Sequence, residues 1–251
     1  MDTITNTLSN TAISTVFSIE NLDQYLQAKN LTKDTITEFT IPDDVTEIGP
    51  SAFVGCSSLK SITIPDGVTR IGPWAFQNCT SLTSIDIPAG VTEIGAEAFW
   101  ACTGLTSIDI PGSVKTIGAV AFSQCRSLTS IDIPDGIKKI SVATFWNCSS
   151  LTSIDIPATV EEIGMQAFSG CESLTNIIIP ANVTKVGMQA FEACNRLASI
   201  NIPGSVTEIG DRAFQYCTSL TSINIPGSVT KIGENAFQGC TNLAVIICSY
   251  P

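Results

Sequence analysis

Apolar and polar residues alternate in a pattern that returns every 23 residues along most of the chain. In the stretch LTSIDIP, Ile85 and Ile87 fall on one face of an extended segment and Asp86 falls on the other. This spacing of two is typical of a β-strand with one buried face. Pro88 has no N–H to donate, so the hydrogen-bonded strand ends there. The pattern therefore predicts a short strand at the start of every repeat.

The rest of each unit predicts two further short elements. Val91 and Ile94 begin a second inward-facing stretch, and Gly95 supplies a turn because glycine adopts φ values of either sign. A short helical turn is then expected from three apolar residues that fall on one side of it, Ala98, Phe99 and Cys102. Leu105 starts the next unit. At the position of Gly95, one unit carries Ser141 instead, and we expect local strain there if the turn requires a positive φ.

Columns of identical residues extend this unit along the chain. The cysteines fall at Cys56, Cys79, Cys102, Cys125, Cys148, Cys171, Cys194, Cys217 and Cys240. The phenylalanines fall at Phe53, Phe76, Phe99, Phe122, Phe145, Phe168, Phe191, Phe214 and Phe237. Nine full units occupy residues 36–242 and a partial terminal repeat occupies 243–251. A fixed period of this length predicts a solenoid, in which each unit buries its apolar side against its neighbours.

The two ends of the array differ from its repeats. Residues 1–35 carry no repeat and are expected to form an N-terminal capping segment with a helix near 18–30. Ser18 is a suitable N-cap, and one side of the helix is apolar through Ile19, Leu22 and Leu26. At the other end LAVIICSYP leaves the pattern, with little chain to cover the last unit. Two explanations stay open: the chain was cut short, or the open end meets another molecule, including a second copy in self-association.

The consensus IPxxVTxIGxxAFxxCxxLTSIxIP resembles the BspA-like, treponemal-type leucine-rich repeats over residues 36–247. The resemblance implies an α/β repeat fold: a right-handed, curved leucine-rich repeat solenoid with a parallel β-sheet on its concave side. Short strands and helical turns form the other faces. It also implies a microbial cell-surface or secreted protein, of a kind often linked to adhesion to host or matrix proteins. It identifies no ligand.

Charge and hydropathy exclude several classes of partner. The chain has 12 Lys and Arg against 23 Asp and Glu, a net charge of −11, so nucleic acid and anionic membranes are not expected partners. No run of 18 apolar residues predicts a membrane span. Met1 is followed by polar residues rather than by a signal peptide, so either a signal was removed and a Met added, or export does not use that route.

No constellation of residues predicts catalysis, and no cofactor is expected. Histidine, the commonest general base and metal ligand, is absent, and there is no phosphate-binding glycine loop. The ten cysteines lack the close pairs that zinc sites use. Adjacent units bring thiols near bridging distance, but a whole column cannot pair. We expect buried free thiols, with a less certain environment for Cys248.

An acidic stripe is the first candidate binding surface. The outward position between the two isoleucines is aspartate in four consecutive units, at Asp86, Asp109, Asp132 and Asp155. One interpretation is a solvated ladder that discourages sheet-to-sheet aggregation. The other is a site for a basic partner or a cation, although a flat column offers few of the six to eight oxygens that calcium requires.

Aromatic residues at variable positions are the second candidate. The repeat keeps Phe for its core, whereas Trp74, Trp100, Trp146 and Tyr216 stand where other units carry Gln, Ser, Glu or Ala. Trp100 and Trp146 hold identical positions two units apart, with Ser123 between them. Exposed Trp and Tyr are typical anchors of protein interfaces, although a lone surface Trp is often incidental.

These observations favour a non-enzymatic scaffold that binds another macromolecule, a protein ligand from host or matrix fitting best. The alternative from another class is a structural spacer or array with no ligand of its own. Binding to ice or a mineral through the Thr and Ser columns is less favoured, because it needs a flat lattice and leucine-rich repeats curve.

Overall fold

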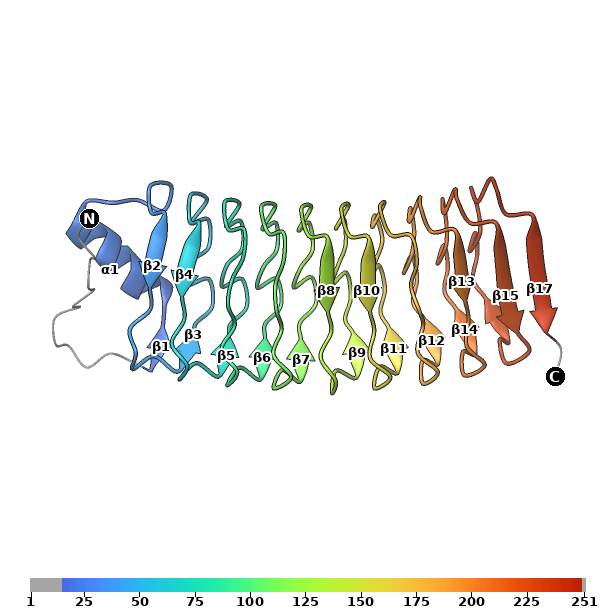
Figure 1. The fold of residues 1–251 in the computed structure, drawn as a ribbon, viewed down its shortest axis with the longest axis horizontal. Coiled ribbons are helices and arrows are strands. Elements are labelled where there is room, and N and C mark those ends of the chain that lie inside the picture. Colours follow the sequence, from blue (N-terminus) through green and yellow to red (C-terminus); the bar gives the residue numbers. More distant parts are fainter. Residues whose placement is uncertain (1–14, 250–251) are drawn as a thin grey trace.

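The computed structural model describes residues 15–249 and forms a solenoid of parallel strands with about nine turns (Figure 1). The predicted fold class, a solenoid with parallel strands, is confirmed. The first 14 residues of the expected capping segment and the last two of the partial repeat lie outside the described residues.

Two columns of strands run along the solenoid. The first strand column holds the L-x-x-I-x-I segments: β2 (Glu38–Thr40), β4 (Ser61–Thr63), β8 (Ser130–Asp132), β10 (Ser153–Asp155), β13 (Ser199–Asn201), β15 (Ser222–Pro226) and β17 (Val245–Ser249). The second strand column follows the proline turn: β1 (Val16–Phe17), β3 (Glu47–Ile48), β5 (Arg70–Ile71), β6 (Glu93–Ile94), β7 (Thr116–Ile117), β9 (Lys139–Ile140), β11 (Glu162–Ile163), β12 (Lys185–Val186), β14 (Glu208–Ile209) and β16 (Lys231–Ile232). Every pairing is parallel, and within the repeats each strand residue lies beside its equivalent 23 positions away. The first pairing, between β1 and β3, joins residues 31 positions apart, as Val16 with Glu47.

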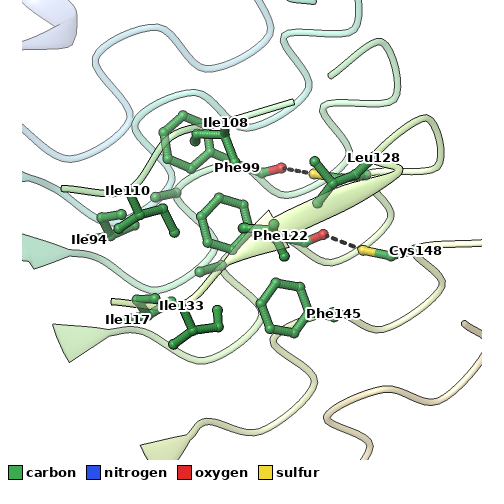
Figure 2. Packing of buried hydrophobic residues seen from close by; sticks show 14 of the residues in the cluster. Ile94, Phe99, Ile108, Ile110, Ile117, Phe122, Leu128, Ile133, Phe145 and Cys148 are labelled. Atoms are coloured by element: carbon green, nitrogen blue, oxygen red, sulfur yellow. Dashed lines mark hydrogen bonds between the residues drawn. The ribbon is translucent and has the colours of Figure 1, made fainter. Parts of the chain in front are cut away.

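The apolar columns form one continuous core. The rings from Phe53 to Phe237 stack in sequence with neighbouring centroids 5.3–5.8 Å apart and planes within 9° of parallel. Leu, Ile and Val columns close around them (Figure 2). Burial of the same residue in every unit explains why these letters do not vary.

All ten cysteines are free thiols, as expected from the sequence. Each thiol in the column after the first donates a hydrogen bond to the carbonyl oxygen of a Phe from the preceding unit, as Cys148 does to Phe122 at 3.1 Å (Figure 2). Burial raises the pKa of Cys102 and of Cys148 to about 12. The column is therefore a neutral, hydrogen-bonded part of the core, and Cys248 stands outside it as an exposed thiol.

The segment from the glycine to the cysteine differs from the expected helical turn. Alternate N–H groups point to the next unit, as Phe76 N–H does to Ala98 O at 2.8 Å. The residues between them close tight turns, as Gln77 N–H does to Trp74 O at 3.1 Å. This alternation places two residues of each unit in the left-handed region, for example Trp74 at φ 57° and Asn78 at φ 60°. We call this side of the solenoid the turn face.

The glycine that recurs after each strand of the second column permits a close backbone approach and does not have a positive φ. A Cβ at Gly95 would lie 2.5 Å from Pro73 N and 2.6 Å from Gly72 C. Ser141, at the equivalent position, is not among the residues with positive φ, so the strain considered from the sequence is absent. Its Oγ donates to Ile117 O at 2.8 Å, the carbonyl that a glycine N–H reaches in other units. Here the second strand column divides into two five-stranded sheets, between β7 and β9.

The solenoid ends are unequal. Helix α1 (Ile19–Lys29) lies over the N-terminal end (Figure 1), with Ser18 as N-cap in a capping box with Asn21. Its Leu22 and Leu26 are buried in the core. At the other end Val245, Ile246 and Ile247 of β17 are about half exposed, at 48%, 51% and 52%. No helix within residues 15–249 is long and apolar enough to cross a membrane.

Candidate protein-binding surface

Trp100 and Trp146 flank a hollow of about 280 Å³ on the turn face. Both side chains are half-buried. The hollow is lined by Glu97, Trp100, Val120, Ser123, Ala143, Trp146 and Gln166. The 23-residue register produces this arrangement, because it stacks the two tryptophans on either side of Ser123. We call this feature the tryptophan hollow.

Ser123 is the polar residue between the two tryptophans. Its residue is fully buried, and its Oγ has no hydrogen-bond partner among the described residues. An unsatisfied buried hydroxyl costs about 1–3 kcal/mol, so its presence calls for an explanation. Ser123 is therefore the one unsatisfied hydroxyl that the described residues bury at this hollow.

Val120, which also lines the hollow, adds backbone strain to the unsatisfied hydroxyl of Ser123. Its φ is 63°, in the left-handed region, where a β-branched residue is a genuine outlier. Equivalent positions in other units hold residues without a β-branch, such as Gln189 and Asn235. Backbone strain of this kind clusters at binding sites, where the surrounding structure maintains it.

The lining of the tryptophan hollow carries hydrogen-bond acceptors and no basic side chain. Glu97 is half-buried and forms no ion pair within the described part of the chain. Some glutamates of the array are paired, such as Glu93 with Arg70 at 3.1 Å and Glu208 with Lys231 at 2.8 Å, whereas others, such as Glu192, form no ion pair within the described residues either. The hydrogen bond from Lys231 lowers the pKa of Glu208. Glu97 is thus an anionic group with no cation of its own.

The other two aromatic candidates lie apart from the tryptophan hollow. Trp74 is 40% exposed and precedes Glu97 by one unit, outside the lining. Tyr216 is 49% exposed, and its ring lies against the backbone of Gly239, where a Cβ would be 2.4 Å from Tyr216 Cδ1. The structure therefore brings two of the four aromatic candidates together.

The four aspartates of the acidic stripe are exposed on the first strand column. Asp86 pairs with Asp109, and Asp132 pairs with Asp155, in parallel register. Threonine hydroxyls beside them bond to the preceding unit, as Thr106 Oγ1 does to Thr83 O at 3.1 Å. Within residues 15–249 no group of three or more His, Cys, Asp or Glu could hold a metal ion.

Two features of the site, the backbone strain at Val120 and the unpartnered hydroxyl of Ser123, were missed by the sequence analysis. The strain at Val120 depends on the left-handed backbone of the turn face, and the missing partner of Ser123 depends on how deeply the unit packs. A signal for Val120 did exist, since a β-branched residue occurs once in a column of Ser, Trp, Glu, Ala, Gln, Arg and Asn.

Comparison with known proteins gives consistent matches. A family model described as a BspA type leucine rich repeat region, in six copies, matches residues 24–152 and 138–249. A leucine rich cell surface protein from Faecalibacterium prausnitzii is 32% identical, with 86% of this chain and 80% of that one covered and a TM-score of 0.50. The leucine rich repeat protein TpLRR from T. pallidum is 34% identical, with 66% and 79% covered and a TM-score of 0.60.

The pneumococcal vaccine antigen PcpA shares the fold at 19% identity, with 87% of this chain and 69% of that one covered and a TM-score of 0.53. A search of curated proteins found no significant match.

Proposed function

The chain belongs to the BspA-type leucine-rich repeat family, and from this premise we propose that it binds a protein partner through the tryptophan hollow. The family implies a protein-interaction scaffold, and leucine-rich repeat proteins are generally non-enzymatic. The proposal adds where on the solenoid the partner binds.

The observation that carries this proposal is the presence of two tryptophans that the framework does not need. Glutamine occupies the same position in other units, at Gln77, Gln215 and Gln238. The phenylalanine column continues unbroken beneath both kinds of residue. Tryptophans that are spare to packing and that surround an unpartnered hydroxyl are what an interface anchor requires.

We further propose that the chain is a surface or secreted adhesion protein with a host or matrix protein as its partner. The relative from Faecalibacterium prausnitzii, 32% identical, is described as a cell surface protein. The net charge of −11 favours a partner with a basic surface.

A second interaction, self-association through the C-terminal end, is favoured by β17. Three consecutive apolar residues are half exposed there, Val245, Ile246 and Ile247. Exposed apolar edge strands pair readily with another chain. A dimer formed in this way would leave the tryptophan hollow free, so the two interactions can be measured separately.

The test compares capture of the protein on immobilised extracellular-matrix and serum proteins, using three versions of the chain. They are the unaltered protein, Trp100→Gln with Trp146→Gln, and Asp109→Asn with Asp132→Asn. Gln is native to the tryptophan position in other units, so the first variant alters the surface and spares the framework.

We expect the tryptophan variant to lose at least about 30-fold in affinity, the loss typical of interface anchors, and the aspartate variant to bind normally. Loss in the aspartate variant alone would move the site to the acidic stripe. Absence of capture for the unaltered protein would favour the spacer function.

A further inference from the structure

We infer that the tryptophan hollow takes one arginine side chain of the protein partner. This inference rests on the proposed function and specifies the chemical group that enters the site. Three features carry it: the aromatic walls, the unpaired carboxylate of Glu97, and the absence of any basic residue from the lining.

The walls suit a planar cation with an apolar face. Two units separate Trp100 from Trp146, so the stacking repeat places them roughly 10 Å apart. A planar group midway between them lies about 5 Å from each ring, within the roughly 6 Å over which a cation and a ring face attract one another. Tryptophan has the most favourable ring face for a cation, and the guanidinium group stacks on aromatic faces.

The polar groups of the hollow are matched to a donor with several N–H groups. Glu97 contributes a carboxylate, and the side-chain oxygen of Gln166 is an acceptor, since Gln166 Nε2 donates to Gln189 at 3.4 Å. Ser123, which also lines the hollow, is fully buried, and its hydroxyl has no hydrogen-bond partner among the described residues. Arginine has five N–H donors and no acceptor, which fits a lining of acceptors.

Arginine fits better than lysine because of the cost of burial. The guanidinium is more weakly hydrated than an ammonium and loses less on entering a half-buried hollow between two rings. The chain's own arginine nearby does not fill the hollow. Arg126 donates to Gln124 at 3.1 Å and lines a separate depression with Asn147, Ser149 and Glu172.

The experiment titrates 15N-labelled protein with capped arginine, Nα-acetyl-arginine N-methylamide, and follows the three indole N–H signals by NMR. Each signal is assigned with a single Trp→Gln variant. Capped lysine and capped citrulline serve as controls, because citrulline keeps the shape of arginine without its charge. We expect saturable shifts for Trp100 and Trp146 in the millimolar range, with Trp74 unmoved and no saturation with citrulline.

Glu97→Gln should weaken the binding of capped arginine about two- to fivefold, the range for an accessible ion pair. Gln occurs at the equivalent positions 166 and 189, so the variant preserves the framework. Glu192→Gln is the matched control, because Glu192 lies outside the hollow and accepts from Gln189; it should bind capped arginine normally.

Equal binding of citrulline, tighter binding of lysine, or no shift of the two indoles would each overturn the inference. If capped arginine fails while Trp100→Gln with Trp146→Gln still abolishes protein capture, the hollow binds its partner through another group and the proposed function stands. If protein capture survives that variant, the proposed function itself fails.

Discussion

The tryptophan hollow and the units that follow it on the turn face have the same backbone conformation. They differ in whether their polar side chains find hydrogen-bond partners within the chain. In the later units Gln189 Nε2 donates to Glu192 at 2.7 Å, and Gln189 in turn accepts at 3.4 Å from Gln166, which lies at the edge of the hollow. Gln215 Nε2 donates to Gln238. We call this set the amide ladder. The tryptophan hollow, one step earlier in the array, leaves Ser123 Oγ without a partner and Glu97 without an ion pair.

The two regions share one core, so the difference does not come from the framework. Phe99 and Phe122 stack at 5.4 Å beneath the hollow, and Phe191 and Phe214 stack at 5.4 Å beneath the amide ladder. One region satisfies its own polar groups, and the other contains a buried hydroxyl without a partner. The repeating residues build the shared core, and we propose that the substituted residues carry recognition.

The largest expected effect is alkaline unfolding, which both regions should share. Eight thiols of the column are buried. Burial raises the pKa of Cys102 and Cys148 from 9.0 to about 12, so the folded chain keeps these protons while the unfolded chain releases them. Stability is fully present below about pH 9 and is lost as pH rises towards 12. Each thiol that stays protonated in the folded chain adds about 1.4 kcal/mol per pH unit to this loss.

Urea unfolding at a series of pH values checks this loss and compares the regions. Cys102→Ala beneath the hollow and Cys194→Ala beneath the amide ladder should each reduce the slope by about 1.4 kcal/mol per pH unit. A stability that is flat between pH 9 and 11 would show that the thiols ionise in the folded state. If Cys102→Ala reduced the slope of stability against pH less than Cys194→Ala did, solvent would reach the core beneath the hollow.

Removal of one ring from the core should cost about 3–5 kcal/mol of unfolding free energy in either region. Phe122→Ala tests the hollow and Phe191→Ala tests the amide ladder. The ring centroids of Phe122 and Phe145 are 5.8 Å apart, against 5.4 Å for Phe191 and Phe214. We therefore expect Phe191→Ala to lower the unfolding free energy slightly more than Phe122→Ala. If Phe122→Ala proved cheaper by more than about 2 kcal/mol, the two regions would not share one framework.

Relief of backbone strain should give a smaller effect of the opposite sign. Val120→Asn replaces a β-branched residue at φ 63° with the residue that occupies the equivalent position 235, and should stabilise the fold by about 1 kcal/mol. Gln189→Asn, at φ 56° in the amide ladder, should gain less because glutamine has no β-branch. Thermal unfolding of both variants measures the difference in stabilisation. Equal stabilisation by the two substitutions would show that Val120 is not specially strained.

The period of the pattern was enough to predict a solenoid with buried Phe and Cys columns, and the resemblance to a known family added the parallel sheet. Each is a property of residues that recur in every unit, so one unit predicts them all. Free thiols followed from the same regularity, since stacked cysteines cannot all pair. These predictions needed no knowledge of the turn geometry.

The turn face was harder to predict because its backbone conformation leaves little trace in the residues. Left-handed positions usually show as glycine or asparagine. The first left-handed position of each unit holds residues such as Trp74, Glu97 and Val120, and only the second holds glycine or asparagine in several units, as at Asn78 and Gly170. The recurring glycine after the second strand permits a close backbone approach instead. For this reason backbone strain is considered at Ser141 from the sequence, whereas the structure shows that its hydroxyl donates a hydrogen bond to Ile117 O. The set of residues that lines the hollow follows from this turn geometry and could not be predicted from the repeat pattern.

The central claim, that the tryptophans are spare to the framework, is tested most directly by the free energy of unfolding in urea. Trp100→Gln with Trp146→Gln gives the hollow the residue that other units carry at the same position. We expect this free energy to change by less than about 1 kcal/mol, as for surface substitutions away from the core. A loss of about 3 kcal/mol or more, comparable to that of Phe122→Ala, would contradict the claim and make the tryptophans packing residues.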